Sequence, residues 1–447
     1  MSLPAPGLPH TRPCLSIWQR STRHNALLNE GRASDLPPTA DAIVIGSGIS
    51  GALTALELLS SPNGPKNVVM LEAREAVSGA TGRNAGHCRP DAFRGFSAFS
   101  KRINPEQAMK IIVHEKLVLQ LLKAFIKKHN IDCDFDYCRT FDVVMGKEFL
   151  DYVTGSFEAY KQAGGDTSDI TCLNILAGYS RSTCTRGLRM DSRQFAPCQT
   201  VPVGSTTCQV ARPVAFHPHT PVTSVTSSGN ANDEWVVNTP RGSISTPIVV
   251  HATNAFAATL IPCLKSQVRP VRAQAHKLIP TAPFTGRNIL SHTYSLRFSL
   301  SHFYSVIQRK GDGAIVLGTS RGVPGIGQEI FETKDDSVVN KTIQEDCLAN
   351  FKQVFSDWGD EVLGEGHEFG WTGILGLTKD AVPFIGPVPS LPGQFVIAGF
   401  NGHGMARIFG SAPGLAQIIL GGKWSDTTMP ECFQITTERL ERLSALP

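Results

Sequence analysis

A short apolar run that ends in a glycine-rich turn and continues directly into a helical pattern constrains this chain most. Residues 42–45 are Ala-Ile-Val-Ile, and Gly46, Gly48 and Gly51 follow with G-x-G-x-x-G spacing. In such a unit the first glycine permits a tight turn, the second lets the backbone approach a pyrophosphate, and the third lets the helix lie close to the strand. The N-terminus of the helix then directs unpaired N–H groups at the phosphates.

The sequence after this helix distinguishes a dinucleotide site from an ordinary βαβ turn, which three glycines alone do not do. A second apolar run, residues 68–71, ends in Glu72, which lies 21 residues beyond Gly51. A carboxylate at this spacing accepts hydrogen bonds from ribose hydroxyls. The sequence therefore predicts an α/β dinucleotide-binding domain.

The size and composition of the chain exclude several other classes. Its 447 residues are enough for two domains or for one large discontinuous domain. The formal charge of +4 comes from scattered Lys and Arg residues, which indicates no nucleic-acid partner. The 11 cysteines include no pair of C-x-x-C clusters, and the closest two, Cys133 and Cys138, lack zinc spacing. We therefore expect reduced thiols in the cytoplasm and no metal site.

The N-terminal residues match neither a membrane helix nor a signal peptide. No apolar run approaches the ~20 residues of a membrane span. Residues 1–29 lack acidic residues and carry Arg12, Arg20 and Arg23, as a mitochondrial presequence does. Prolines within the first 13 residues oppose the amphipathic helix that a presequence requires. We therefore expect residues 1–39 to form an arm packed on the folded body, without membrane contact.

Periodicity and turn residues predict most other elements, but residues 171–221 follow no pattern. About fifty irregular residues are unusual inside a compact domain, so this segment is either a divergent insertion or a mis-spliced or frame-shifted stretch. The expected helices cover residues 104–130, 147–163, 335–358 and 402–420, and the clearest strands cover residues 141–145, 247–254, 303–308, 314–318 and 394–398.

Four separated segments together resemble the D-amino-acid-oxidase-like flavoproteins, the FAD-dependent amine and amino-acid oxidoreductases. They are the fingerprint from Gly46 to Glu72, the loop 78–87 with its Gly-Arg-Asn-x-Gly-His sequence, residues 249–254 and residues 399–405. The loop is most similar to that of the glutamylputrescine-oxidase-like branch, which includes fungal FAD-dependent amine oxidoreductases. The resemblance covers most of residues 14–171 and 220–422.

The resemblance implies a Rossmann-like FAD-binding domain, discontinuous in sequence, and a second α+β substrate domain built on an antiparallel sheet. Residues 40–100, 171–260 and 371–422 would form the first domain. Residues 101–170 and 261–370 would form the second, and residues 423–447 a C-terminal tail.

The resemblance also implies how FAD is held. The glycines would hold its diphosphate and Glu72 its adenosine ribose, while the loop 78–87 would pass beside the isoalloxazine. Residues 402–405 would open the last helix toward the flavin N1/O2 edge, where negative charge develops on reduction. Arg74 would either stack near the adenine or be exposed to solvent. The residues expected to bind FAD are Gly46, Ser47, Gly48, Ser50, Gly51, Glu72, Ala73, Arg74, Ala80, Thr81, Asn84, Ala85, Gly86, His87, Val222, Ala252, Thr253, Gly402, His403, Gly404 and Met405.

The reaction that the resemblance implies is oxidation of a C–N bond of an amine or amino acid. A hydride passes to flavin N5 and leaves an imine that water hydrolyses, so the cofactor supplies the difficult chemistry. Arg89 is the first candidate for holding a substrate carboxylate or polarising the flavin, with a structural ion pair as the alternative. The candidates His87 and His403 either lie near the ring or are backbone-bonded loop residues. Tyr304 either caps the pocket or belongs to the core.

Three positions depart from the patterns of characterised members. Gly373 stands where sarcosine-oxidase-like enzymes carry their linking cysteine, and Arg83 lies near the linking histidine of dimethylglycine-dehydrogenase-like enzymes. We therefore expect non-covalent FAD. Val316 stands in place of an oxygen-activating lysine, which leaves oxygen and another electron carrier both open as acceptors. The sequence does not distinguish a monomer from a homo-oligomer.

Two other functions stay open at this point. The irregular residues 171–221 fit a degenerate FAD-binding protein with little or no turnover. The fingerprint alone fits an NAD(P)-linked enzyme, against which the loop 78–87 and residues 402–405 argue.

Overall fold

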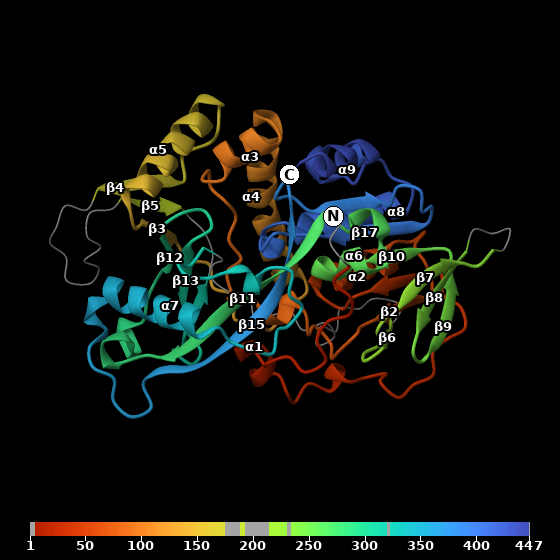
Figure 1. Ribbon diagram of the computed structural model, residues 1–447, viewed down its shortest axis with the longest axis horizontal. Coiled ribbons are helices and arrows are strands. Elements are labelled where there is room, and N and C mark those ends of the chain that lie inside the picture. The colour runs from red at the N-terminus through yellow and green to blue at the C-terminus, as the bar shows by residue number, and fades with distance from the viewer. Residues whose placement is uncertain (1–4, 175–187, 193–213, 230–233, 320–321, 447) are drawn as a thin grey trace.

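The computed structural model describes residues 5–174, 188–192, 214–229, 234–319 and 322–446. Two large sheets lie in opposite halves of the molecule, and helices α3 (Phe96–Arg102) and α4 (Pro105–Lys128) lie between the halves (Figure 1). Strands from widely separated parts of the sequence contribute to each sheet, so both halves are discontinuous in sequence.

A six-stranded sheet carries the glycine-rich turn. All neighbouring strands in it are parallel except the first two of its spatial order. That order is β16 (Phe384–Pro387), β17 (Gln394–Ala398), β10 (Val249–His251), β1 (Ala42–Ile45), β2 (Val68–Leu71) and β6 (Ala215–His217).

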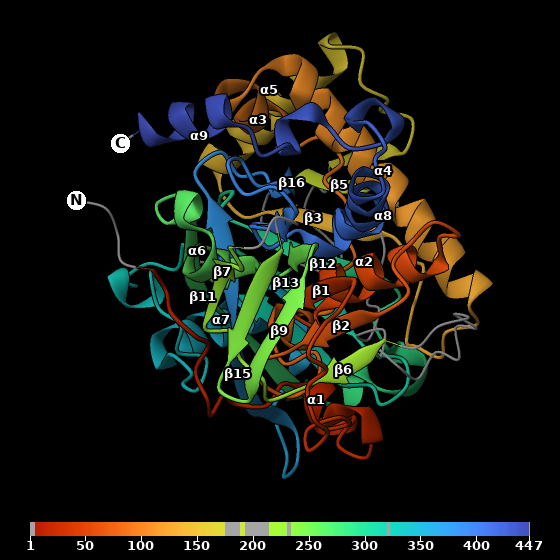
Figure 2. The same cartoon turned by 90° about the vertical axis from the view of Figure 1, so that its right-hand side faces the viewer.

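Both faces of the six-stranded sheet are covered. Helices α2 (Ile49–Ser60) and α8 (Ile408–Ile419) pack on one face. A small antiparallel sheet of β7 (Ser224–Ser227), β8 (Trp235–Thr239) and β9 (Gly242–Thr246) covers the other (Figure 2). Because neither face meets water, β1 and β2 are apolar along their whole length.

An eight-stranded sheet forms the other half. Its strands are antiparallel except for one parallel pair, β12 with β3. The order is β15 (Gly366–Thr378), β11 (Val268–Ile279), β14 (Ile315–Thr319), β13 (Phe303–Gln308), β12 (Thr293–Arg297), β3 (Thr140–Val144), β5 (Leu188–Ser192) and β4 (Ile170–Asn174).

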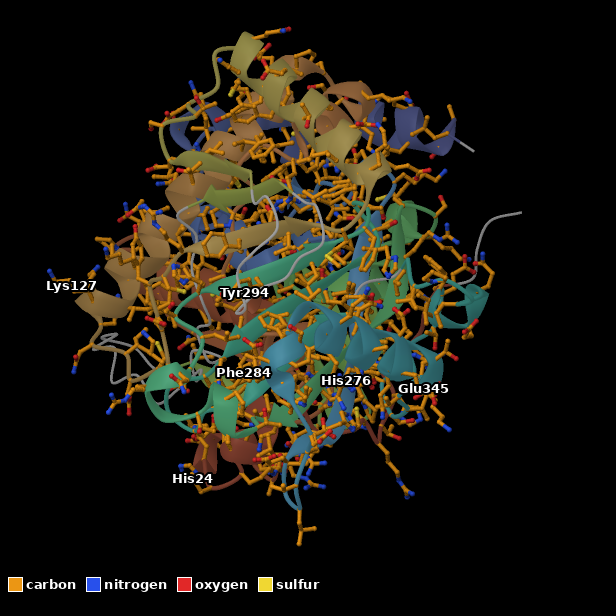
Figure 3. All side chains as sticks on the ribbon, turned by 90° about the vertical axis from the view of Figure 1, so that its left-hand side faces the viewer. His24, Lys127, His276, Phe284, Tyr294 and Glu345 are labelled. Atoms are coloured by element: carbon orange, nitrogen blue, oxygen red, sulfur yellow. The ribbon has the colours of Figure 1, made fainter. Side chains whose placement is uncertain are left out.

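Helix α7 (Lys341–Val354) crosses one face of this second sheet (Figure 3). Phe284 packs against Trp358 and Tyr294 against Phe355, with ring centroids 5.4 and 5.3 Å apart. These aromatic residues and α7 cover one face of the sheet. The opposite face lines the cavity described below.

The remaining helices are α1 (Ile17–Ser21), α5 (Lys147–Gln162), α6 (Ala257–Leu260) and α9 (Thr437–Ser444). Helix α4 begins where the sequence predicts, because the Asn104 side chain accepts from the Gln107 N–H and Pro105 takes the first helical position. In the part of the chain that the structure describes, no helix has both the length and the apolar composition of a membrane span.

The predicted fold class is confirmed, while several details differ. Residues 170–174 and 188–192 pair at the edge of the eight-stranded sheet, whereas we expected residues 171–260 in the FAD-binding domain. Most of the irregular segment, residues 175–187 and 193–213, lies outside the described residues. The helix expected over 335–358 covers only Lys341–Val354, and the C-terminal tail contains α9.

Candidate cofactor and active site

A cavity of about 550 Å³ opens between the two sheets, at the carboxyl ends of β1, β2, β10 and β17. This edge is where open α/β sheets bind ligands. Every residue that we expected to bind FAD lines the cavity except Ser47, Gly51 and Gly86, and Arg89 lines it as well. The structure therefore gathers the four sequence segments around one space.

Close backbone approaches explain two of the three fingerprint glycines. Gly46 has a φ of +109°, and a Cβ atom there would lie 2.6 Å from the carbonyl oxygen of Ala252. A Cβ atom on Gly51 would lie 2.0 Å from the carbonyl oxygen of Gly46. Gly48 precedes α2 and caps it with no side chain, so the first turn of the helix opens on the cavity.

Ser47 does not line the cavity because it lies behind Glu72 and holds the Glu72 carboxylate in place. The backbone N–H and the hydroxyl of Ser47 both donate to Glu72 Oε2, at 3.0 and 2.8 Å. The N–H of Arg74 donates to the other carboxylate oxygen at 3.0 Å. The carboxylate thus has a fixed orientation at the end of β2.

Arg74 lines the cavity, but its guanidinium is bound elsewhere. Nη1 forms an ion pair with Asp336 at 2.9 Å and donates to the His10 carbonyl at 3.1 Å, and Nη2 donates to the Ser78 carbonyl. The side chain is therefore neither exposed to solvent nor free to stack on an adenine. Its contribution to binding stays a prediction.

The loop 78–87 is braced by its own side chains. Asn84 donates to the Thr81 carbonyl at 2.7 Å and accepts from the Gly86 N–H at 2.8 Å, which explains why Gly86 lies outside the wall. Arg83 is buried and donates to the carbonyls of Ser78 and Thr372. This bracing presents Ala80, Thr81, Asn84 and Ala85 to the cavity.

His87 is the most unusual member of this loop. Neither ring nitrogen has a hydrogen-bond partner among the described residues, although both are buried. Burial, together with the charge of Arg89, lowers the pKa of His87 to about 3, so the ring is neutral. An unpartnered buried imidazole at a cavity wall is costly unless a ligand meets it.

Residues 402–405 line the cavity, but they do not open a helix directly. A 3₁₀ turn, Gly404–Ala406, intervenes before α8 begins at Ile408. The Asn254 side chain accepts from the N–H groups of Gly399 and Phe400, at 3.1 and 3.2 Å, and so fixes this loop. Burial and Arg407 lower the pKa of His403 to about 3.

Arg89 belongs to a buried cluster that the sequence does not reveal. Its Nη2 lies 2.5 Å from Asp142 Oδ2, and Arg94 Nη1 contacts the same oxygen. Arg297 Nε lies 3.2 Å from Asp142 Oδ1. Arg89, Arg94 and Arg297 also line the cavity. The three guanidiniums hold the pKa of Asp142 far below its usual range.

Two other candidates lie away from the cavity wall. Tyr304 is buried beneath α7 and contacts Asp346 and His302, so it belongs to the core. Val316 is buried with Trp18 and Trp371. In the described residues no group of three potential metal ligands gathers.

Comparison with known proteins identifies the family to which this arrangement belongs. The family model described as FAD dependent oxidoreductase (DAO) matches residues 41–418. The chain belongs to this family. FAD is therefore the cofactor, and the NAD(P)-linked alternative is ruled out.

Two curated relatives of this FAD-dependent oxidoreductase are distant. Gamma-glutamylputrescine oxidoreductase of Escherichia coli is 21% identical over 385 residues, covering 86% of this chain and 84% of that protein. A probable oxidoreductase, OrdL of Haemophilus influenzae, is 21% identical over 390 residues, covering 86% and 83%.

Solved structures share the fold. Glycine oxidase from Geobacillus kaustophilus has a TM-score of 0.70 at 18% identity, covering 90% of this chain and 99% of that one. L-Proline dehydrogenase from P. horikoshii has a TM-score of 0.68 at 19% identity, covering 91% and 99%.

The residues of the flavoprotein cavity fit FAD. Gly46 and Gly51 leave no room for a side chain beside the turn where the diphosphate would lie. His87 and the Thr253 hydroxyl are buried at the wall without partners among the described residues, which suits a ligand with ring nitrogens and carbonyls. Glu72 would meet the ribose, and residues 402–405 the flavin edge.

We expect acid precipitation to release the flavin into the supernatant. Arg83 fills the space beside Gly373, where a Cβ atom would lie 3.0 Å from Arg83 Cβ, and neither position offers a nucleophile for a covalent link. Absorbance of the pellet and the supernatant measures the partition. Flavin that stays in the washed pellet would contradict non-covalent binding.

Proposed function

We propose that this chain oxidises the C–N bond of an amine or amino acid, and that its substrate carries an anionic group. The cluster around Asp142 is the observation that carries this proposal, because three guanidiniums line the cavity beside two carboxylates, Asp142 and Asp91, and so leave positive charge in excess. Burial and the neighbouring arginines lower the pKa of Arg297 to about 9, and a bound anion would relieve this repulsion. The printed names of the relatives, which concern amines and amino acids, support the same reaction class.

Each part of the site has a role in this proposal. Bound FAD supplies the hydride acceptor. Arg89 and Arg297 orient the anionic end of the substrate, and the braced loop 78–87 would hold the flavin beside it. His87 and His403 are neutral at pH 7 and add no charge that would repel a protonated amine.

Anaerobic mixing of the yellow protein with amines and amino acids under argon tests the reaction. Loss of the flavin absorbance near ~450 nm on addition of a substrate is the expected result. If flavin is bound and no amine or amino acid bleaches it, the result favours the alternative of a degenerate FAD-binding protein with little or no turnover. Admitting air to the bleached protein then tests oxygen as the acceptor, because the flavin absorbance returns only if oxygen reoxidises the flavin.

For the location of the protein in the cell, we propose the cytoplasm.

Replacing Arg89 by Ala tests the anion-binding role. We expect flavin to stay bound, while the KM for an anionic substrate rises by about tenfold or more, equivalent to about 1.4 kcal/mol. Arg269→Ala is the matched control, because Arg269 pairs with Glu332 at the surface. An unchanged KM and an unchanged turnover number in the Arg89 variant would exclude the role.

A further inference from the structure

The N-terminal arm contributes to the cavity although it precedes the residues that match the family. The family match begins at residue 41, yet Gly7, Leu8 and Pro9 line the cavity. In Figure 1 the red arm passes α1 at the lower edge of the molecule and continues beneath the half that holds the six-stranded sheet. The arm therefore forms part of the wall of the cofactor cavity.

The first part of the arm is anchored beside the end of β2. Thr259 Oγ1 donates to the Gly7 carbonyl at 2.9 Å, and Arg74 Nη1 donates to the His10 carbonyl at 3.1 Å. Arg74 follows Glu72 in the chain, so residues 7–10 lie on the side of the cavity where the adenosine half of FAD is expected. The buried ion pair with Asp336 fixes the guanidinium of Arg74, so that Nη1 can also donate to the arm.

The second part of the arm holds the loop 78–87. Ser16 Oγ donates to the Gly82 carbonyl at 2.5 Å, and Trp18 Nε1 donates to the Asn84 carbonyl at 2.7 Å. The Cys14 carbonyl accepts from Arg83 at 2.6 Å. Trp18 is only 1% exposed, so this attachment is as firm as a core contact.

We propose that the arm is a structural part of the FAD site. Residues 7–9 close the cavity over the adenosine half, and residues 14–18 fix the loop that meets the flavin. The arm would chiefly slow FAD dissociation, because the contacts that it makes with the bound ligand must break before the ligand leaves. This inference depends on FAD as the cofactor and is independent of amine oxidation.

Removal of residues 1–12 tests the first part. This truncation keeps Cys14, Ser16 and Trp18, so the loop attachment survives. We expect the Kd for FAD to rise by about tenfold or more, measured by quenching of FAD fluorescence on binding to the apoprotein. The Kd for ADP should rise as well, since ADP shares the adenosine diphosphate half alone. Arg23→Ala is the control, because its pair with Glu75 joins arm and body at the surface.

A point variant keeps the test decisive if the truncated chain does not fold. Leu8→Asp places a carboxylate at the wall that faces an anionic ligand, whereas Leu8→Met conserves volume and charge. We expect the first to raise the Kd for FAD and ADP by about tenfold and the second to leave both within about twofold. If the Leu8→Asp variant, and the truncated chain where it folds, bind FAD and ADP as the full chain does, the proposal is wrong. These measurements need no amine, so they stand whether or not turnover is found.

Discussion

Asp142→Asn is expected to lower the free energy of unfolding by about 3–5 kcal/mol, the cost of breaking a buried ion pair by removing one partner. The Asp142 side chain is 3% exposed and contacts Arg89, Arg94 and Arg297. A neutral amide in its place would leave the three guanidiniums with one nearby carboxylate among the described residues, Asp91, which pairs with Arg94 alone of the three. Chemical denaturation of the apoprotein measures the loss.

The pH dependence separates this effect from a loss of packing. The arginines depress the pKa of Asp142, so its contribution is present above the unfolded pKa of about 3.9 and is lost only as pH falls through the lower folded value. The difference between the wild type and the variant should therefore stay constant from about pH 7 to pH 5 and shrink below about pH 3.9, whereas a loss of packing alone would give a difference that does not change with pH.

Two further variants make the Asp142 prediction specific. Asp151→Asn breaks an exposed pair with Lys147 and should change stability by at most about 1 kcal/mol. Adding Arg297→Met to Asp142→Asn removes a cation that pairs with Asp142 and should restore part of the loss, whereas Arg94 keeps Asp91 as a second partner. A difference below about 1 kcal/mol for Asp142→Asn alone would show that the cluster does not depend on its carboxylate.

The gathering of the expected cofactor residues around one cavity could be predicted because their signals are local. Gly46, Gly51 and Glu72 belong to one strand–helix–strand unit, whose geometry fixes where residues at that spacing lie. The loop 78–87 follows directly, so its position was constrained as well. The same reasoning placed the start of α8 too early, because glycine-rich sequence does not show where a 3₁₀ turn gives way to a helix.

The arginine cluster around Asp142, where we propose that the substrate binds, could not be predicted in the same way. Asp142 is separated from Arg94 by 48 positions and from Arg297 by 155. Asp142 and Arg297 meet because β3 and β12 pair in parallel, a non-local pairing that no periodicity encodes. The sequence singled out Arg89 beside a recognised loop, whereas its neighbour Arg94 carried no signal except proximity in the chain. Tyr304 shows the same limit, because alternation along β13 does not tell which face meets α7.

Gly51→Ala is expected to raise the Kd for FAD by about tenfold or more and to destabilise the chain by about 3 kcal/mol, the upper part of the range for overpacking. The added Cβ atom would lie 2.0 Å from the Gly46 carbonyl oxygen, 3.1 Å from Val44 and 3.2 Å from Ala252. The first contact is with backbone, so no rotamer change relieves it. Either α2 moves off β1 or the Gly46 turn shifts, and both displace the N–H groups that would hold the diphosphate.

Gly155→Ala is the matched control, because it makes the same substitution inside another helix. A Cβ atom on Gly155 would meet nothing within 4 Å, so the variant should gain stability by about 0.5–1 kcal/mol from the higher helix propensity of alanine. Propensity favours alanine at both positions, and only the space around the new atom differs. Opposite signs in thermal unfolding, with FAD affinity lost in the Gly51 variant alone, would show that close packing of α2 on β1 sets the cofactor site. A Gly51→Ala protein that melts and binds FAD like the wild type would show that the turn is not held by this contact.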